Sequence, residues 1–126
     1  SNNLIFVSAT LKGNIDEKFK IKNKINDLIK RKKDSQPLGV KTCGSTFKNP
    51  KNNKAWELIK KSGCSGMEIG GAKISEKHCN FFVNTGNAKS KDLERLFYEV
   101  KNKVLSKTGI SLELEIQIIG ENSWTI

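Results

Sequence analysis

The chain has 126 residues, a formal net charge of +10 at pH 7, 36% hydrophobic residues and 29% charged residues. This length suits one domain with a modest core, and no apolar run approaches the roughly 20 residues that span a bilayer. The sequence predicts no signal peptide. Its three cysteines, Cys43, Cys64 and Cys79, form no CxxC pair. This count argues against a disulfide framework or a metal site such as structural zinc, and favours a reducing, cytoplasmic compartment.

The excess of positive charge admits three interpretations: a nucleic-acid-binding protein, a site for an anionic small substrate such as a nucleotide, or lysines spread over solvated helix faces. Residues 30–33 form a dense basic run, but the sequence lacks the alternation of basic and aromatic residues that suits base stacking. We favour solvated lysines for most of the charge. A basic α+β nucleic-acid-binding module, whose affinity would fall steeply with salt, is the alternative. A purely structural interaction domain also stays open.

The first predicted element is a strand over residues 4–11, which are rich in β-branched and large apolar side chains. Because a strand needs a partner, we expect further chain upstream of it. Residues 15–33 predict a helix that Asn14 can cap. Pro37 biases the residue before it away from helix, so the helix should end within residues 34–39. The apolar residues of this helix share one face: Ile21, Ile25, Leu28 and Ile29.

A short extended piece at residues 40–42 precedes a second helix that begins after Pro50. The apolar stripe of this helix and the glycine that ends it are Ala55, Leu58, Ile59 and Gly63. Trp56 adds a large side chain of a type that belongs more often to a core than to a ligand platform.

Residues 67–75 predict two short extended pieces that meet at Gly70 and Gly71. Paired glycines allow a tight hairpin or the close approach of a ligand. They do not form a dinucleotide fingerprint, because the sequence contains no GxGxxG. Residues 79–83 then predict a buried strand.

A third helix is predicted to start with Ser90 as its cap and to end at Gly109. Its apolar stripe consists of Leu93, Leu96, Phe97, Val100 and Val104. Residues 112–119 alternate apolar and polar side chains, which predicts a half-buried strand. The complete order of elements predicts an α+β fold, with a mostly antiparallel sheet of about four or five strands packed with three amphipathic helices.

The stretch with the most chemistry is residues 43–50. It contains a glycine, a hydroxyl that donates or accepts a proton, a donor-only cation and an amide: Gly44, Ser45, Lys48 and Asn49. These groups suit a site where main chain meets a ligand. A tight turn between a strand and a helix, with Pro50 as an ordinary turn signal, would explain the same residues without a site.

Residues 44–50 resemble the GS-x-FKNP signature of the UDP-N-acetylenolpyruvoylglucosamine reductase, or MurB, family. Five further stretches match other family signatures, and their order along the chain is also that of the family. Residues 36–38 resemble QPL, and residues 55–59 resemble a helix that begins A-x-x-LI. Three more resemble the G-x-x-IGGA turn, the N-x-x-NA loop and the closing E-V-x-IIGE strand: residues 66–72, 84–88 and 114–121.

This resemblance implies the third domain of a three-domain flavoenzyme, with residues 12–126 as the C-terminal substrate-binding domain and residues 1–11 as the last strand of the FAD-binding region. The first two domains of the family hold FAD and the catalytic arginine, and the third closes over a UDP-sugar. NADPH reduces the FAD, which reduces the enolpyruvyl double bond of the substrate. We therefore expect this chain alone to bind no cofactor and to be inactive. It also resembles the second, loopless form of the family, since residues 12–14 leave no room for a substrate-covering loop.

The resemblance assigns Ser45 as the proton donor and Glu115 as the residue that polarises the substrate carboxyl group. A serine is a weak acid and needs surroundings that stabilise its alkoxide. A glutamate beside a carboxylate must be protonated or offset by a cation. Without the resemblance, Glu115 would be an ordinary solvated glutamate on a strand.

Three substrate-binding residues follow from the same resemblance. Asn49 matches a substrate-binding asparagine. Lys33 stands at the spacing of a substrate-binding lysine, although Arg31 or Lys32 could take that place within the basic run. His78 falls where the family can place a polar contact to substrate, but a lone histidine is more often structural.

Overall fold

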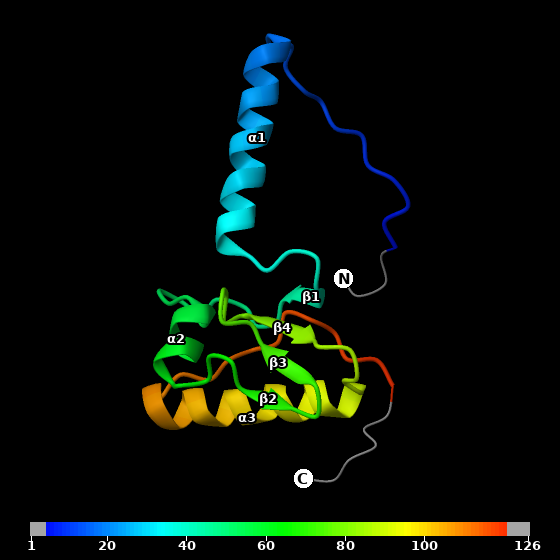
Figure 1. Ribbon diagram of the computed structural model, residues 1–126. Helices are drawn as coiled ribbons and strands as arrows, with labels where there is room; N and C mark the ends of the chain where they lie inside the picture. Colours follow the sequence, from blue (N-terminus) through cyan, green and yellow to red (C-terminus); the bar gives the residue numbers. More distant parts are fainter. Residues whose placement is uncertain (1–4, 121–126) are drawn as a thin grey trace. The chain divides into compact units, whose positions relative to one another are not determined.

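The computed structural model describes residues 5–120 (Figure 1). The chain divides into two compact units, one formed by residues up to 32 and the other by residues from 33 on. Helix α1 (Lys18–Ser35) begins in the first unit and ends in the second.

The first unit consists of residues 5–17, which form no helix or strand, and most of α1. Helix α1 contains no buried residue. The four residues of its predicted apolar stripe are between 42% and 56% exposed: Ile21, Ile25, Leu28 and Ile29. The apolar face that the sequence predicted is therefore present, but nothing described in this unit buries it.

The predicted strand at residues 4–11 is wrong for residues 5–11, which adopt no strand; Leu4 lies outside the described residues. A strand exists through hydrogen bonds to a neighbouring segment, and no strand that the structure describes pairs with this one. Ile5 and Phe6 are 89% and 91% exposed. A β-type composition without a pairing partner does not make a strand.

Helix α1 starts three residues later than predicted. The backbone N–H of Ile21 donates to the carbonyl of Glu17 at 3.0 Å, so the first turn closes on Glu17. The Lys20 ammonium also donates to the Glu17 carboxylate, at 2.8 Å. These contacts make Glu17 the residue just before the helix, so the start lies beyond the Asn14 cap that the sequence indicated.

The second unit contains a four-stranded antiparallel sheet in the order β1-β4-β3-β2. Its strands are β1 (Lys41–Ser45), β2 (Glu68–Ile69), β3 (Ala72–Ile74) and β4 (Phe81–Asn84). Strands β2 and β3 form the predicted hairpin at Gly70 and Gly71, both with positive φ. With three helices and this sheet, the predicted α+β class is confirmed.

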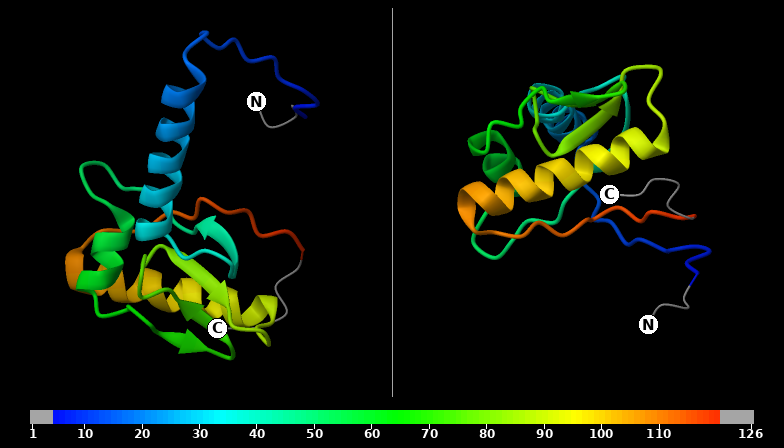
Figure 2. Two further views of the ribbon diagram at one scale, coloured as in Figure 1. Left: turned by 45° about the horizontal axis from the view of Figure 1, so that its top comes forward. Right: turned by 90° about the horizontal axis from the view of Figure 1, so that it is seen from below.

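Helices α2 (Ala55–Lys61) and α3 (Ser90–Thr108) pack with the sheet around one core, and α3 runs along one face of the sheet (Figure 2). Three aromatic rings meet edge to face in the core: Phe47 lies 5.8 Å from Phe82 and 6.4 Å from Phe97, centroid to centroid. The predicted helix stripes supply six further core residues: Ala55, Leu58, Ile59, Leu96, Val100 and Val104. Trp56 is partly buried and packs against this core.

Helix α3 begins one residue away from the predicted cap. Lys89 is the N-cap residue, and its backbone N–H donates to the carboxylate of Asp92 at 2.9 Å. Ser90 is the first residue of the helix. Gly109 ends the helix in a left-handed conformation, as predicted.

The predicted strand over residues 112–119 is not a regular strand. It contains one isolated bridge, from Leu114 to Phe47. The predicted alternation is nevertheless present, because Leu112 is buried, Leu114 is half-buried and Glu113 is exposed. The segment pairs with residues 46–48, which lie between the end of β1 and Pro50. Few residues are therefore present there to form a longer ladder.

Candidate functional site

Strand β1 carries Ser45 at its end, after a break in the regular pairing with β4. Thr42 pairs with Val83 and Ser45 with Phe81, and the register shifts between these two pairs. Gly44 lies inside the irregularity with φ near +87°, a conformation that glycine adopts without strain. Such bulges redirect the side chains that follow. The glycine before the serine is therefore needed by the local backbone path.

Asn80 holds the segment that follows Ser45. Its side-chain oxygen accepts from the Phe47 N–H at 2.9 Å, and its side-chain nitrogen donates to the Phe47 carbonyl at 2.8 Å. Its backbone carbonyl accepts from the Thr46 N–H at 2.8 Å. Asn80 is only 4% exposed. Sequence reasoning missed this residue, although an asparagine next to two buried phenylalanines is a recognisable signal.

The second neighbour of this segment is the chain around Glu115. The Glu115 N–H donates to the Thr46 carbonyl at 2.9 Å, and the Lys48 N–H donates to the Glu113 carbonyl at 2.8 Å. Ser45 and Glu115, distant in sequence, thus lie on adjacent backbone segments, and both side chains are exposed. Backbone pairing therefore places the two segments side by side, and the catalytic roles of Ser45 and Glu115 stay predictions.

Lys48 forms an ion pair with Glu113 on the exposed side of these paired segments. The hydrogen bond from the Lys48 ammonium to Glu113 raises the pKa of Lys48, and the charge of Glu113 adds to this effect. The charge of Glu115 raises the Lys48 pKa further. One cation therefore interacts with both carboxylates.

Asn49 has a structural contact in addition to any contact with substrate. Its side-chain oxygen accepts from the Ala55 N–H at 2.9 Å, at the first residue of α2. The residue is exposed overall. Asn49 thereby fixes the loop between the Ser45 segment and the helix, and its predicted contact with substrate stays a prediction.

His78 is half-buried among aromatic side chains. Its ring centroid lies 4.8 Å from that of Phe81 and 6.1 Å from that of Trp56. Its Nδ1 accepts from the Asn80 N–H at 3.3 Å. Burial lowers the pKa of His78 below its usual value, so the neutral ring is favoured. These contacts give His78 a packing role, and a contact with substrate stays a prediction.

The candidate lysine site lies at the end of α1. Lys33 is exposed, and its backbone carbonyl accepts from the Lys77 ammonium within the second unit. Arg31 and Lys32 are exposed residues of the first unit. The geometry does not choose among the three, and the choice of Lys33 stays a prediction.

Two shallow cavities lie beside β1. One, of about 290 Å³, is lined by Lys41, Thr42, Cys43, Phe82, Asn84 and Leu93. The other, of about 230 Å³, lies between the start of α3 and the chain after Glu115 and is lined by Cys43, Ser90, Leu93, Glu94, Phe97, Ile116, Gln117, Ile118 and Ile119. Cys43 lines both cavities and lies two residues before Ser45, and Ile116 lines the second and follows Glu115 directly. Neither cavity includes the side chain of Ser45 or Glu115 in its lining.

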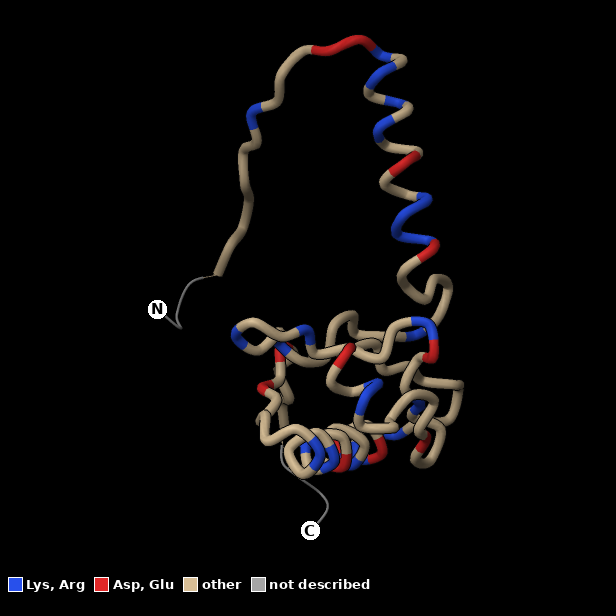
Figure 3. The backbone as a smooth tube through the Cα atoms, turned by 90° about the vertical axis from the view of Figure 1, so that its left-hand side faces the viewer, with Lys and Arg blue, Asp and Glu red and all other residues tan. Residues whose placement is uncertain are grey.

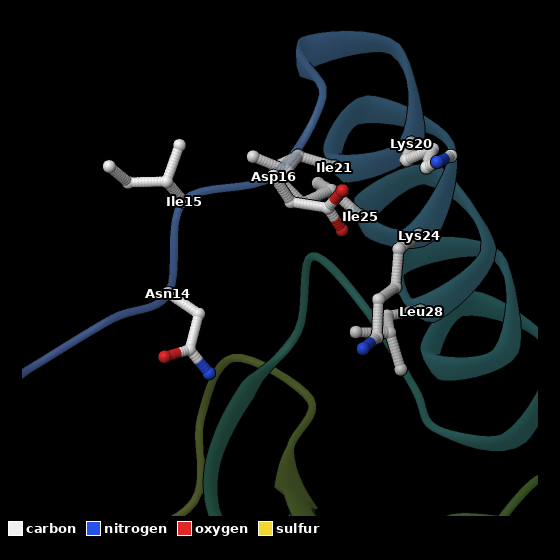
Figure 4. A pocket seen from close by; sticks show the side chains of 8 residues that line it. All are labelled: Asn14, Ile15, Asp16, Lys20, Ile21, Lys24, Ile25 and Leu28. Atoms are coloured by element: carbon white, nitrogen blue, oxygen red, sulfur yellow. The ribbon is translucent and has the colours of Figure 1, made fainter.

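A further hollow of about 370 Å³ lies in the first unit, between residues 14–16 and one face of α1 (Figure 4). Ile21, Ile25 and Leu28 line it, with the ammonium-bearing side chains of Lys20 and Lys24 beside them. The exposed apolar face of α1 thus forms one wall of this hollow. Over residues 5–120 there is no cluster of three potential metal ligands, and no helix has the length and hydrophobicity that a membrane crossing requires.

Comparison with known proteins identifies the family. A family model described as "UDP-N-acetylenolpyruvoylglucosamine reductase, C-terminal domain" matches residues 36–119. The chain belongs to the MurB family. It is 52% identical over 116 residues to the UDP-N-acetylenolpyruvoylglucosamine reductase of Anaplasma marginale, which covers 92% of this chain and 39% of that protein. It is also 52% identical over 118 residues to a Wolbachia reductase of the same name, covering 94% of this chain and 40% of that protein.

The crystal structure of MurB from Thermus caldophilus has the same fold. It matches with a TM-score of 0.67 and 35% sequence identity, over 80% of this chain and 35% of that chain. The chain thus spans about two-fifths of the length of its curated MurB relatives and corresponds to their C-terminal domain.

The nucleic-acid-binding alternative is not supported, since these relatives are reductases. The charge distribution agrees with solvated lysines. Basic residues are spread along the length of α1, whereas acidic and basic residues are interspersed in the second unit (Figure 3).

Proposed function

We propose that this chain is the substrate-binding domain of a cytoplasmic reductase that converts UDP-N-acetylglucosamine enolpyruvate to UDP-N-acetylmuramate, with NADPH and FAD, for peptidoglycan synthesis. The adjacency of the Ser45 and Glu115 segments is the observation that carries the proposal. Membership of the MurB family supports the choice of reaction.

In this proposal Ser45 delivers a proton to the carbon next to the one that is reduced. An exposed hydroxyl at the end of β1, after a bulge that redirects the chain, is free to face a substrate. Glu115 polarises the substrate carboxyl group from the neighbouring segment. Asn49, Lys33 and His78 are proposed to contact the UDP-sugar.

FAD is assigned to the rest of the polypeptide. The additional length of the curated relatives beyond this chain supports this assignment. When the FAD-binding domains of the full-length polypeptide hold FAD, the flavin supplies the hydride that it receives from NADPH. The residues of this chain bind and orient the substrate and move the proton.

The partner of the first unit is proposed to be the FAD-binding part of the same polypeptide. The apolar side chains of residues 5–11 and of α1 are largely exposed, including Val7 at 91% and Phe19 at 73%. Apolar groups gathered in this way mark an interaction surface. The additional length of the relatives supplies a candidate to cover it.

The decisive experiment is Ser45→Ala in the full-length reductase, followed by stopped-flow absorbance of the flavin. Reduction by NADPH should proceed normally, and reoxidation by the enolpyruvyl substrate should slow by roughly 10²–10⁴-fold, the usual contribution of general acid catalysis. Ser106→Ala, an exposed serine of α3, is the matched control. Reoxidation at the normal rate in Ser45→Ala would refute the assignment.

A second experiment tests whether this chain binds FAD without the rest of the polypeptide. The 126-residue chain is mixed with FAD and passed through a desalting column, and the flavin absorbance of the protein fraction is measured. We expect the flavin to separate from the protein. Stoichiometric retention would contradict the assignment of FAD to the rest of the polypeptide.

A further inference from the structure

The pairing of the segments after Ser45 and around Glu115 places a cation against one carboxylate and near a second. Phe47 and Leu114 are direct partners in an antiparallel bridge. Their outer neighbours are therefore also opposite one another: Lys48 faces Glu113, and Thr46 faces Glu115. Because side chains alternate along paired segments, Lys48 and Glu115 project from the same face as diagonal neighbours, within reach of long side chains.

The observed contacts agree with this register. The Lys48 ammonium is hydrogen-bonded to the Glu113 carboxylate, and the charge of Glu115 acts on Lys48 as well. Both partners of the ion pair are substantially exposed, Lys48 at 49% and Glu113 at 74% of their side chains. The pair thus lies on the protein surface and is accessible to solvent.

The local charge gives Lys48 a role at a site for a carboxylate. Glu113 and Glu115 would leave two negative charges side by side, and the proposed substrate brings a third. Like charges at contact distances disfavour each other unless one is protonated or a cation offsets them. Lys48 supplies that cation within this chain.

We propose that Lys48 is a positioning residue for the reduction: its ammonium, anchored by Glu113, offsets the charge of Glu115 and lets that side chain face the anionic enolpyruvyl group. The inference rests on the proposed function, since Glu115 is the substrate-facing residue there. Lys48 acts through Glu115 and need not touch the substrate.

The charge contact is tested first in the 126-residue chain, without cofactor or substrate. NMR follows the Lys48 Nζ and Cε resonances as the pH is raised, in the unsubstituted chain, in Glu113→Gln and in Glu115→Gln. The pKa of Lys48 should fall in both variants, and more in Glu113→Gln, which also removes the hydrogen bond. An unchanged pKa of Lys48 in Glu115→Gln would overturn the inference.

The functional role is tested in the full-length reductase by the substrate dependence of flavin reoxidation. Lys48→Met should raise the half-saturating concentration of the enolpyruvyl substrate by roughly two- to fivefold, as for other exposed charge pairs. The difference should shrink at high salt, and Lys48→Arg should restore most of the loss. Lys73→Met is the matched control, because Lys73 pairs with Glu76 at 3.1 Å elsewhere in the second unit.

A double-substitution cycle separates positioning from direct binding. If Lys48 acts through Glu115, Lys48→Met should have little further effect in the Glu115→Gln background. A full additional loss in that background would overturn the positioning role, as would a single Lys48→Met variant that behaves like the unsubstituted enzyme. Failure of the proposed function itself would look different, because Ser45→Ala and Glu115→Gln would then both reoxidise normally.

Discussion

Helices α1 and α3 have the same amphipathic sequence pattern but differ in whether their apolar faces are buried. Each has apolar residues at helical spacing on one face. Helix α3 buries Leu96, Phe97, Val100 and Val104, whereas α1 buries no residue. The pattern therefore predicts a helix and its apolar face, but the presence of a partner decides whether that face becomes core.

The extended segments repeat this contrast. Residues 5–11 in the first unit adopt no strand, and residues 112–119 in the second unit adopt one isolated bridge. The second of these segments is nevertheless held by Glu113 and Glu115 through backbone hydrogen bonds to residues 46–48. Pairing, and not composition, separates the two.

The largest expected effect breaks the core of the second unit. Phe97→Ala removes a side chain that is 5% exposed and that packs edge to face on Phe82 at 5.2 Å, so it should lower the free energy of unfolding by about 3–5 kcal/mol. Ile25→Ala in α1, where the side chain is 50% exposed, should change it by less than about 0.5 kcal/mol. Urea denaturation followed by circular dichroism measures both. Equal losses would contradict the contrast between the helices.

The same Ile25→Ala substitution sharpens the contrast in the full-length polypeptide. If the FAD-binding part covers α1, Ile25→Ala should lower the free energy of unfolding of the full-length protein by more than about 1 kcal/mol, as for a buried aliphatic side chain. Thermal unfolding of the full-length protein, compared with that of the 126-residue chain, checks this. An equally small loss in both would remove α1 from the proposed interface.

The next largest effect concerns the buried asparagine. Asn80→Ala leaves the N–H and carbonyl of Phe47 without their partners in a buried segment, which should cost about 2–3 kcal/mol. Asn53→Ala is the control, because Asn53 is exposed and its side chain donates to the nearby Lys51 carbonyl at 3.1 Å. Chemical denaturation provides the measurement, and a loss no larger than that of Asn53→Ala would show that Asn80 does not hold the site segment.

A glycine of the β2–β3 hairpin should give an intermediate effect. A methyl group at Gly70 would lie 2.5 Å from the carboxyl carbon of Asp92, which caps α3 through the Lys89 N–H. With the left-handed conformation of Gly70 added, Gly70→Ala should cost about 2 kcal/mol. Gly63→Ala has similar φ but open space around the new methyl group and should cost about 1 kcal/mol. Equal denaturant midpoints for the two variants would rule out the contact with Asp92.

The smallest expected effect is a dependence of stability on pH through the only histidine of the chain. Burial lowers the pKa of His78 in the folded state, so the unfolded state binds the proton more readily. Stability should therefore fall as the pH drops from about 6.5, the ordinary histidine value, through the lowered folded pKa. His78→Phe should remove this dependence, as measured by denaturant midpoints across that range. The same slope in His78→Phe would assign it to other groups.

The sequence by itself determined the α+β class, the three helices and the apolar face of each, because these depend on local spacing. It also determined the family, since its signatures are local stretches such as residues 44–50. The cap at Lys89 in place of Ser90 and the later start of α1 depend on individual hydrogen bonds, which spacing does not fix.

Only the tertiary structure decided which segments meet. It placed Glu115 beside Thr46, set Asn80 as the clamp on Phe47, and left residues 5–11 without a partner. The physical reason is that backbone pairing and core packing act between residues far apart in the chain, so no local pattern records the partner. The ion pair of Lys48 with Glu113, close enough to Glu115 to feel its charge, is a result of the same kind.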